Sequence, residues 1–556
     1  MKNLLFFAAS LSLLSAVCGG DSGGNAAFGP PPPLIRFYAT PGSGEIRLTW
    51  SRPPEDADQA EVLVLRTTGA YAASHGDAGA FAAYSGTGTS FTDSTAAEGT
   101  LHYYSKFTRD SSGSWSDDVV EGVTAANTAW SSVEYLCGTD DLDNSCTPSG
   151  LATLIGSAGV SETIRIARGT HDWGSAVTVN KRVVISGGGS CPDCGDPDPS
   201  GTWSWPVTLN ISGNSAFIVN SPSSGDLVRI TGLSFDGNGP GFDYTDGLTT
   251  GIITEATANR SRYRFDNLRF SESGQWISTF RTNGNEAYGV IDHVYLYNSA
   301  DGGNPRFLHN TGHGGDRGDT DWRRPTYWGS ENFVFVEDST LFYEVPNTST
   351  GPLCNDQQGG GRAVFRYNYL YNCSGGNHGT ESGWPARSGV AMEYYGNEFF
   401  WSAPGNKLFT GLLLRGGSLY LHDNTFTNFQ SMLKMWNNRA YGDSPGSSPP
   451  GGTPPYDGPG PPTGYPLIDQ VGRGRAAGVG LAQTQPQAPN RVHIWNNSVV
   501  NTGGGGGCPN QGDSSELSIC DPAYVARGRE YEYSSGGSAA PAAYTPYPYP
   551  HPLTIP

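Results

Sequence analysis

The sequence predicts an all-β protein whose main body is a β-solenoid, and three observations lead to this fold class. The chain has 78 Gly and 39 Pro among 556 residues and is 12% aromatic, which is typical of turn-rich β structure with enough apolar material for a core. Short runs of alternating apolar and polar residues recur through the chain. Seven of these runs share one pattern at a spacing close to the length of one solenoid coil.

The seven repeats align on a fifth residue that is Asn in five of them. The steps between the fifth positions are 27, 44, 30, 29, 27 and 73 residues, so two steps contain insertions, expected at 298–331 and 437–490. We expect the stacked Asn side chains to share hydrogen bonds between coils, as amide ladders do. The repeats are 263–270, 290–297, 334–341, 364–371, 393–400, 420–427 and 493–500.

The first coils carry a resemblance to a known family. Residues 162–169 alternate in apolar character, and residues 177–179 and 182–189 add two further strand patterns that end in three glycines. These coils resemble the opening of the pectate-lyase-like superfamily, and the resemblance covers residues 130–505. It implies a right-handed parallel β-helix. The superfamily includes lyases, hydrolases, epimerases, phage depolymerases and non-catalytic surface proteins, so it implies no single activity.

Residues 34–126 precede the solenoid and show the strand pattern of a small β-sandwich. Trp50 in an early strand and Tyr103 and Tyr104 in a late one resemble a fibronectin type III domain, which is an immunoglobulin-like sandwich. Lys106 stands where that family usually has a small apolar residue. The resemblance implies a spacer or an adhesive module without catalytic chemistry.

The N-terminus has the features of an export signal. Lys2 precedes an apolar run, 4–17, that is too short to span a membrane. Cys18 and the Gly-rich segment after it resemble a bacterial lipoprotein, which implies lipidation of Cys18. Leu14 and Val17 depart from the lipoprotein pattern, so cleavage without lipidation stays open. The expected segments are a signal peptide over 1–17 and a flexible tether over 18–33.

Nine cysteines suit an exported protein with one lipidated cysteine. Once Cys18 is set aside, the other eight fall into local couples, which predicts disulfides formed in an oxidising compartment. Cys191 and Cys194 form a CxxC motif, but no second CxxC or nearby His completes a zinc site. We expect a secreted protein or a lipoprotein of the outer membrane or cell surface. The predicted disulfides are Cys137–Cys146, Cys191–Cys194, Cys354–Cys373 and Cys508–Cys520.

The first candidate site lies in the segment 298–331, which is rich in Gly, charged and aromatic residues. Long loops on a rigid scaffold often carry function. His309 and His313 are four residues apart, but the glycines around His313 exclude a helical metal pair. Three aspartates either hold Ca²⁺ through oxygen ligands or form a solvated loop paired with its own arginines. The candidate calcium ligands are Asp316, Asp319 and Asp321, and the candidate sugar contacts are Trp322, Arg323, Arg324 and Tyr327.

The second candidate site is the segment 373–387, which follows a predicted strand and is held by a predicted disulfide. Elimination at a uronic acid needs a base that removes the C5 proton and a cation that stabilises the carboxylate. His378 is the candidate base. Arg387 or Arg362 is the candidate cation.

Other interpretations of this segment stay open. Glycoside hydrolysis needs two carboxylates at a set separation, which Glu381 and one of the three aspartates would supply. Alternatively, His378 and Glu381 only satisfy backbone groups in a tight turn. Arg415 follows an apolar strand and is either a substrate contact or a hydrogen-bond donor at a corner. Tryptophans that could stack on sugar rings are Trp322, Trp328, Trp384 and Trp401.

The charge pattern argues against nucleic acid as a partner. The formal net charge is −19, and residues 18–250 carry 26 acids and 11 bases, whereas residues 260–440 carry 17 acids and 16 bases. The candidate sites therefore lie in a nearly neutral region, so the local charge does not exclude an acidic polysaccharide as the substrate.

Two functions are consistent with these observations. One is an extracellular polysaccharide-active protein, named a lyase because acidic sugars are common substrates on the resembled fold, with glycoside hydrolysis less favoured. The other is a non-catalytic cell-surface adhesion or glycan-binding protein. Polysaccharide is the expected partner, the membrane is contacted through the lipid anchor only, and Ca²⁺ is the candidate cofactor. Residues 506–556 are expected to form a disulfide-containing tail that covers the end or side of the solenoid.

Overall fold

The structure of the chain is a computed structural model. It describes residues 37–42, 45–50, 60–68, 71–72, 74–97, 101–115, 123–126, 133–192, 194–196, 203–213, 215–220, 227–237, 250–256, 262–272, 278–284, 288–299, 305–310, 328–344, 352–358, 360–377, 388–403, 410–436, 471, 491–501, 516–519, 525–536, 540–541 and 544–554. Cys18 and the Cys508–Cys520 pair lie outside these residues.

Two antiparallel sheets form a sandwich in the N-terminal part. Its core contains Ile46, Leu48 and Trp50 from one sheet and Val62, Val64 and Tyr104 from the other. The Asp93 carboxylate joins the sheets, because it accepts hydrogen bonds from Arg66 Nη1 at 2.6 Å and from Tyr104 Oη at 2.9 Å. One sheet has the order β1 (Phe37–Gly42), β2 (Glu45–Trp50), β5 (Ser90–Asp93), and the other β4 (Phe81–Gly86), β3 (Glu61–Thr67), β6 (Leu101–Arg109), β7 (Val123–Ala126).

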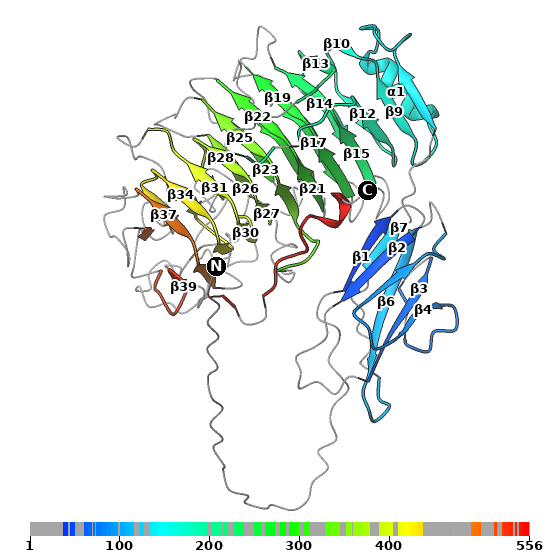
Figure 1. Ribbon diagram of the computed structural model, residues 1–556, viewed down its shortest axis with the longest axis vertical. Helices are drawn as coiled ribbons and strands as arrows, with labels where there is room; N and C mark the ends of the chain where they lie inside the picture. Colours follow the sequence, from blue (N-terminus) through cyan, green and yellow to red (C-terminus); the bar gives the residue numbers. More distant parts are fainter. Residues whose placement is uncertain are drawn as a thin grey trace, which may run out of the picture.

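The main body is a right-handed parallel β-helix built from three long parallel sheets, and Figure 1 shows their strands stacked coil upon coil. We call them sheets 1, 2 and 3. Sheet 1 contains β8 (Glu134–Cys137), β9 (Thr163–Ile166), β12 (Val184–Ser186), β15 (Leu227–Thr231), β18 (Arg262–Asp266), β21 (Tyr288–Asp292), β24 (Val334–Glu337), β27 (Arg362–Arg366), β30 (Ala391–Tyr395), β33 (Ser418–His422), β36 (Val492–Trp495) and β39 (Tyr531–Ser534).

Sheets 2 and 3 complete each coil. Sheet 2 contains β10 (Gly169–Trp173), β13 (Val207–Ile211), β16 (Ser234–Asp236), β19 (Arg269–Glu272), β22 (Tyr295–Asn298), β25 (Thr340–Tyr343), β28 (Tyr369–Tyr371), β31 (Glu398–Phe400), β34 (Thr425–Thr427) and β37 (Ser498–Val500). Sheet 3 contains β11 (Val177–Val179), β14 (Ser215–Val219), β17 (Thr250–Ala256), β20 (Ser278–Gly284), β23 (Arg306–Asn310) and β26 (Leu353–Gln357). It continues through isolated bridges into β29 (Gly375–Gly376), β32 (Thr410–Leu414), β35 (Ser431–Met435) and β38 (Leu517–Ile519).

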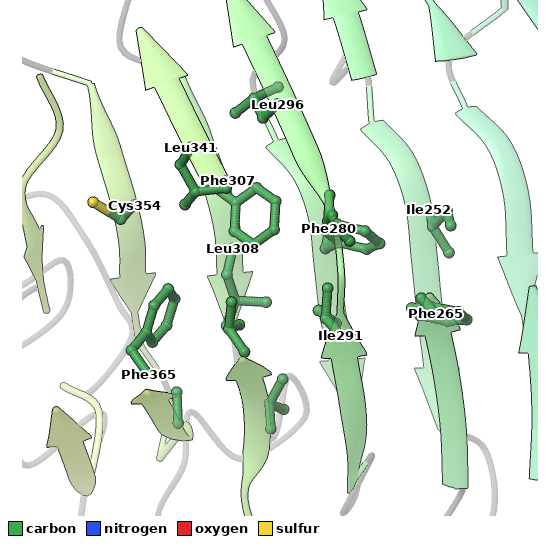
Figure 2. Packing of buried hydrophobic residues seen from close by; sticks show 14 of the residues in the cluster. Ile252, Phe265, Phe280, Ile291, Leu296, Phe307, Leu308, Leu341, Cys354 and Phe365 are labelled. Atoms are coloured by element: carbon green, nitrogen blue, oxygen red, sulfur yellow. The ribbon is translucent and has the colours of Figure 1, made fainter. Parts of the chain in front are cut away.

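Apolar side chains from all three sheets fill the interior. Figure 2 shows Phe265, Phe280, Ile291 and Leu308 from neighbouring strands pointing into the same core, where each is at most 1% exposed. The helix α1 (Pro148–Ser157) covers the first coil with its buried Leu151 and Ile155, and Thr147 caps its N-terminus by accepting a hydrogen bond from the Gly150 amide. Among the described residues, no helix is long and apolar enough to cross a membrane.

An amide ladder runs along the corner between sheets 1 and 2. The Nδ2 groups of Asn368, Asn397 and Asn424 each donate to the Oδ1 atom of the next Asn, at 2.9 to 3.0 Å, and the row ends at Asn497. All four were predicted to stack. Each carboxamide also donates to a backbone carbonyl, so the ladder satisfies buried polar groups of successive coils.

The sequence alignment was wrong by one residue in two of the seven repeats. Arg264, rather than Tyr263, pairs with Val290, and Phe335, rather than Val334, pairs with Val290 on the other side. Asn267 and Asp338 therefore occupy the preceding corner position, where φ is positive at 53° and 49°. Asn and Asp tolerate this left-handed conformation better than most residues, which explains why Asn recurs at both positions and why the alignment slipped.

The segment 298–331 is not a single inserted loop, because residues 306–310 form β23 of sheet 3. At the other end of the chain, residues 544–554 run across the outer face of sheet 1 and finish in the 3₁₀-helix η3 (Pro552–Thr554), which lies beside β21 and β1. We call residues 544–554 the C-terminal strap; in Figure 1 its red trace crosses the coils toward the sandwich.

Candidate active site

A row of neighbouring residues with polar side chains at its two ends crosses the outer face of sheet 3. On β35, Leu433 and Met435 lie in the core, so the alternation of side chains places Lys434 between them on the outer face. The parallel registers place Leu413 beside Lys434, and Gly376 beside Leu413. Gln357 bridges to Asn377, which puts Asp356 next to Gly376, and His309 pairs with Asp356. The row is therefore His309, Asp356, Gly376, Leu413 and Lys434.

The first polar cluster in this row surrounds Asp356. The Arg306 guanidinium forms an ion pair with its carboxylate, with Nε and Oδ2 at 2.6 Å. The Arg306 side chain is 18% exposed and Asp356 only 2% exposed, so the guanidinium is partly accessible whereas the carboxylate that pairs with it is buried. His309, on the neighbouring strand, is buried. The cluster combines a fixed positive charge with an imidazole.

The second polar cluster surrounds Lys434. Arg415, just after β32, donates from Nε to the Asn377 carbonyl at 3.0 Å, and its own amide donates to Asn377 Oδ1 at 2.9 Å. Burial, together with the nearby Arg415 charge, holds the pKa of the Lys434 ammonium below its usual range. Lys434 Nζ lies 5.1 Å from the Trp436 ring centroid. A lysine beside a second cation and an indole is a candidate proton acceptor.

Three strand spacings of about 4.8 Å, or about 14 Å in all, separate the two clusters along the helix axis. Gly375 and Gly376 lie between them. A Cβ atom on Gly376 would come within 2.5 Å of the Leu413 carbonyl oxygen, so the backbone of neighbouring strands approaches closely there. The outer face therefore carries no side chain at Gly376, whereas a Cβ atom on Gly375 would point into the core, within 2.6 Å of Tyr394 Oη.

Both segments predicted to hold the site leave sheet 3 from one edge. Asn310, Gln357 and Asn377 end neighbouring strands, and the residues after Asn310 and Asn377 are 311–327 and 378–387. The candidate residues in these two segments lie outside the described residues. They are Asp316, Asp319, Asp321, Trp322, Arg323, Arg324, Tyr327, His378, Glu381, Trp384 and Arg387. Arg362 is placed on β27 of sheet 1 and is buried.

Two of the tryptophans considered as sugar platforms pack within the protein. Trp401 is 1% exposed and belongs to the core. Trp328 stacks on Tyr420 with ring centroids 3.9 Å apart. Trp401 is therefore one of the tryptophans that belong to the core, and one face of Trp328 is covered by Tyr420.

A half-exposed aromatic row on sheet 2 is likewise a structural feature. Tyr297, Phe342, Tyr371 and Phe400 stack on one another with centroids 4.3 to 5.9 Å apart and planes within 15° of parallel. Because the rings cover one another's faces, they present edges to the solvent. Sugar rings stack on aromatic faces, so this row is a poor sugar platform.

Three predicted disulfides are present: Cys137–Cys146, Cys191–Cys194 and Cys354–Cys373. Cys354 lies on β26 and Cys373 lies just before β29, so their bond holds together the strands that carry Asp356 and Gly376. Hydrogen bonds attach the Cys191–Cys194 loop to later coils. The Cys191 amide donates to Asn267 Oδ1, and the Gly195 amide donates to Thr340 Oγ1. Disulfides of this kind are typical of exported proteins.

No metal site is evident in the described ranges, where no three His, Cys, Asp or Glu side chains come close enough to hold an ion. Lys434 and Asp356 were missed by sequence reasoning, whereas Arg306 lies in the candidate segment 298–331 but had no role assigned. The available signal was a single charge within an apolar strand, as in Ser431-Met-Leu-Lys434-Met, which is the same pattern that singled out Arg415.

Comparison with known proteins gives structural neighbours only. No protein-family model matches the chain, and no curated protein matches it. A pectate lyase from Pectobacterium carotovorum is 12% identical, with 72% of this chain and 85% of that chain covered and a TM-score of 0.16. A family 28 exopolygalacturonase from Yersinia enterocolitica is 10% identical, with coverages of 72% and 95% and a TM-score of 0.22.

A third structure is the catalytic domain of a GH87 α-1,3-glucanase in complex with nigerose. It is 12% identical, covers 89% of this chain and 92% of that chain, and has a TM-score of 0.30. These neighbours are polysaccharide-degrading proteins. Because the TM-scores are low, the description of this chain as a parallel β-helix depends on its own strand registers.

Proposed function

We propose that the protein is an extracellular polysaccharide lyase that acts on acidic polysaccharide at the outer face of sheet 3. The observation that carries the proposal is Lys434, an outward-facing lysine with a lowered pKa beside Arg415. Elimination at a uronic acid requires a base for the C5 proton and a cation that stabilises the carboxylate as it becomes enolate-like. Lys434 would act as the base. Arg415, which stays charged, would be the cation.

The Asp356 cluster supports this proposal because it offers a second cation on the same surface. A polymer lying along the helix axis would reach from Lys434 on β35 to Arg306 on β23, which are four strand spacings, or about 19 Å, apart. Arg306 would contact the carboxylate of another sugar unit, and Asp356 would hold the guanidinium in place. His309 is a second candidate base.

The segments 311–327 and 378–387 would complete the site, because both leave sheet 3 beside these clusters. We keep His378 and Arg387 as further catalytic candidates and Trp322, Arg323, Arg324, Tyr327 and Trp384 as sugar contacts. Asp316, Asp319 and Asp321 remain the proposed calcium ligands.

Glycoside hydrolysis is the alternative reaction. It would use Asp356 or one of the aspartates with Glu381. The ion pair with Arg306 disfavours Asp356 as the acid, because a catalytic acid must carry a proton.

We further propose that the protein is exported and anchored through a lipid on Cys18, with the sandwich as a fibronectin type III-like spacer. A lipid anchor would hold the β-helix near the cell surface, and nucleic acid is not a proposed partner. Palmitate labelling of the wild-type chain and of Cys18→Ala tests the anchor: label on the wild-type chain alone is expected.

The decisive experiment follows unsaturated products by ultraviolet absorbance while the purified chain is incubated with a panel of uronic acid polysaccharides, with and without Ca²⁺. Rising absorbance is expected, and it should fall to background for Lys434→Met but not for Arg491→Met, a control cation that is 51% exposed beside β36. Reducing ends without unsaturation would instead indicate a hydrolase. No product, combined with retention on a polysaccharide gel, would leave the non-catalytic glycan-binding function.

A further inference from the structure

The C-terminal strap contacts sheet 1 without adding a strand to it. Pro546, Pro548, Pro550 and Pro552 alternate with other residues, and proline has no amide hydrogen to donate. The strap crosses several coils, from Glu393 on β30 to Glu337 on β24. Its attachment therefore depends on side chains of the sheet that reach its backbone and hydroxyl groups, as in the recognition of proline-rich peptides.

Arg366 and Glu337 bind the strap backbone. Arg366 Nη1 donates to the Tyr547 carbonyl at 2.7 Å, and Nη2 donates to the Pro548 carbonyl at 2.9 Å. Glu337 accepts the His551 amide at 2.8 Å. Both charged side chains are 0% exposed and are paired with each other. The Arg366 guanidinium thus binds two carbonyls of the strap and the Glu337 carboxylate binds one amide. These three backbone groups make no β-ladder hydrogen bond, so charged side chains satisfy them instead.

Tyrosine hydroxyls and rings add selectivity. Tyr544 Oη donates to Glu393 and Tyr549 Oη donates to Asp338, both at 2.6 Å. The rings of Tyr547 and Tyr549 lie 5.1 Å from Phe335 and 4.1 Å from Tyr367, respectively, measured between centroids. Each of these tyrosines therefore contacts a carboxylate or an aromatic ring on the outer face of sheet 1.

The connection to the strap is longer than the strap position requires. Three strand spacings, or about 14 Å, separate β39 from β30, where Tyr544 docks. The nine residues 535–543 can extend to about 30 Å. The connector therefore does not force the strap to stay on its own sheet, and a segment that can be exchanged between identical chains is a low-cost route to dimers.

We propose that the outer face of sheet 1 is a docking surface for the Tyr-Pro strap and that a second copy of this chain can supply that strap in place of the chain's own. Arg366 and Glu337 would bind the incoming backbone, and Glu393 and Asp338 would bind its tyrosines. The proposal is independent of the polysaccharide chemistry on sheet 3.

The test uses the full chain with a specific protease site inserted in the connector 535–543. After cleavage, a fluorescent synthetic peptide of residues 540–556 is added and its anisotropy is followed. The expected result is saturable binding, weakened at least tenfold for a peptide with Tyr544→Phe and Tyr549→Phe, because two hydrogen bonds to carboxylates are lost. Peptide variants cannot fail to fold, and a scrambled peptide is the matched control.

The second arm tests exchange between uncut chains. The concentrated chain is expected to form dimers, seen by light scattering, that the free peptide converts to monomers. Absence of peptide binding to a cut chain whose melting curve matches the uncut chain would overturn the docking surface. Peptide binding combined with a chain that stays monomeric at every concentration would overturn supply of the strap by a second copy.

Discussion

Arg366 and Glu337 form an ion pair at 2.5 Å between Nη2 and Oε2 in which neither side chain is exposed. They lie on the neighbouring strands β27 and β24, and the C-terminal strap uses their remaining hydrogen-bonding capacity. Similar pairs join Arg264 to Asp292, with Nη2 and Oδ2 at 3.1 Å, and Arg229 to Asp266, with the same atoms at 2.7 Å. A series of arginine–carboxylate pairs therefore stabilises the outer face of sheet 1.

Arg366→Met should lower the free energy of unfolding by about 3 to 5 kcal/mol, because it leaves the Glu337 carboxylate buried without its partner. The double variant Arg366→Met with Glu337→Leu should recover part of the loss, since no buried charge remains. Urea denaturation of the two single variants and the double variant gives the coupling energy. Strictly additive losses would contradict the buried pair.

Two groups at the strap should make stability depend on pH in opposite directions. Burial, opposed by Arg366, raises the pKa of Glu337 from 4.5 to about 7, so its contribution is present below pH 4.5 and is lost as pH rises to about 7. Burial and the charges of Arg366, Arg262 and Arg264 hold the pKa of His551 well below 6.5. Its contribution is present above pH 6.5 and is lost as pH falls.

Single variants should separate these opposing slopes. His551 Nδ1 accepts the Leu553 amide at 3.1 Å, and Asn can accept the same bond without titrating. Between pH 7 and pH 5, His551→Asn should become more stable as pH falls, whereas Glu337→Gln should become less stable. Melting temperatures across this range measure both slopes, and identical slopes in the two variants would exclude this assignment.

Asn397→Ala should lower the free energy of unfolding by about 2 to 4 kcal/mol, because it leaves ladder partners on both neighbouring coils without hydrogen bonds. Asn397 accepts from Asn368 and donates to Asn424, both at 2.9 Å, and is 2% exposed. Asn210→Ala, on the half-exposed outer side of β13, is the control and should change stability by less than about 0.5 kcal/mol. Thermal denaturation compares them.

Lys434→Met should reduce kcat on an acidic polysaccharide by about 10² to 10⁴-fold if Lys434 is the base. The base must be neutral to act, so the wild-type rate should rise with pH through the lowered pKa of Lys434. Arg415→Gln removes the neighbouring positive charge and should move that limb of the profile to higher pH. A profile that keeps its position in Arg415→Gln would assign Arg415 a purely structural role.

Features that depend on short distances along the chain were predictable. The three disulfides join cysteines separated by 9, 3 and 19 residues, and each was predicted from local pairing. The repeat spacing predicted the parallel coils, and four Asn residues of the ladder were assigned to the correct position. The one-residue slips at Tyr263 and Val334 occurred because polar residues suit both the corner and the ladder position.

The sequence by itself therefore determined the solenoid, its coil length and its local crosslinks, because alternation and repetition are local properties of the chain. Only the tertiary structure decided the exact register of neighbouring strands and which side chains that register aligns. It placed Lys434 in the same row as Asp356, and it brought Arg366 to the carbonyl of Tyr547, 181 residues away. In parallel stacked strands, the register determines which side chains become neighbours. The lengths of the segments between the strands do not determine that register.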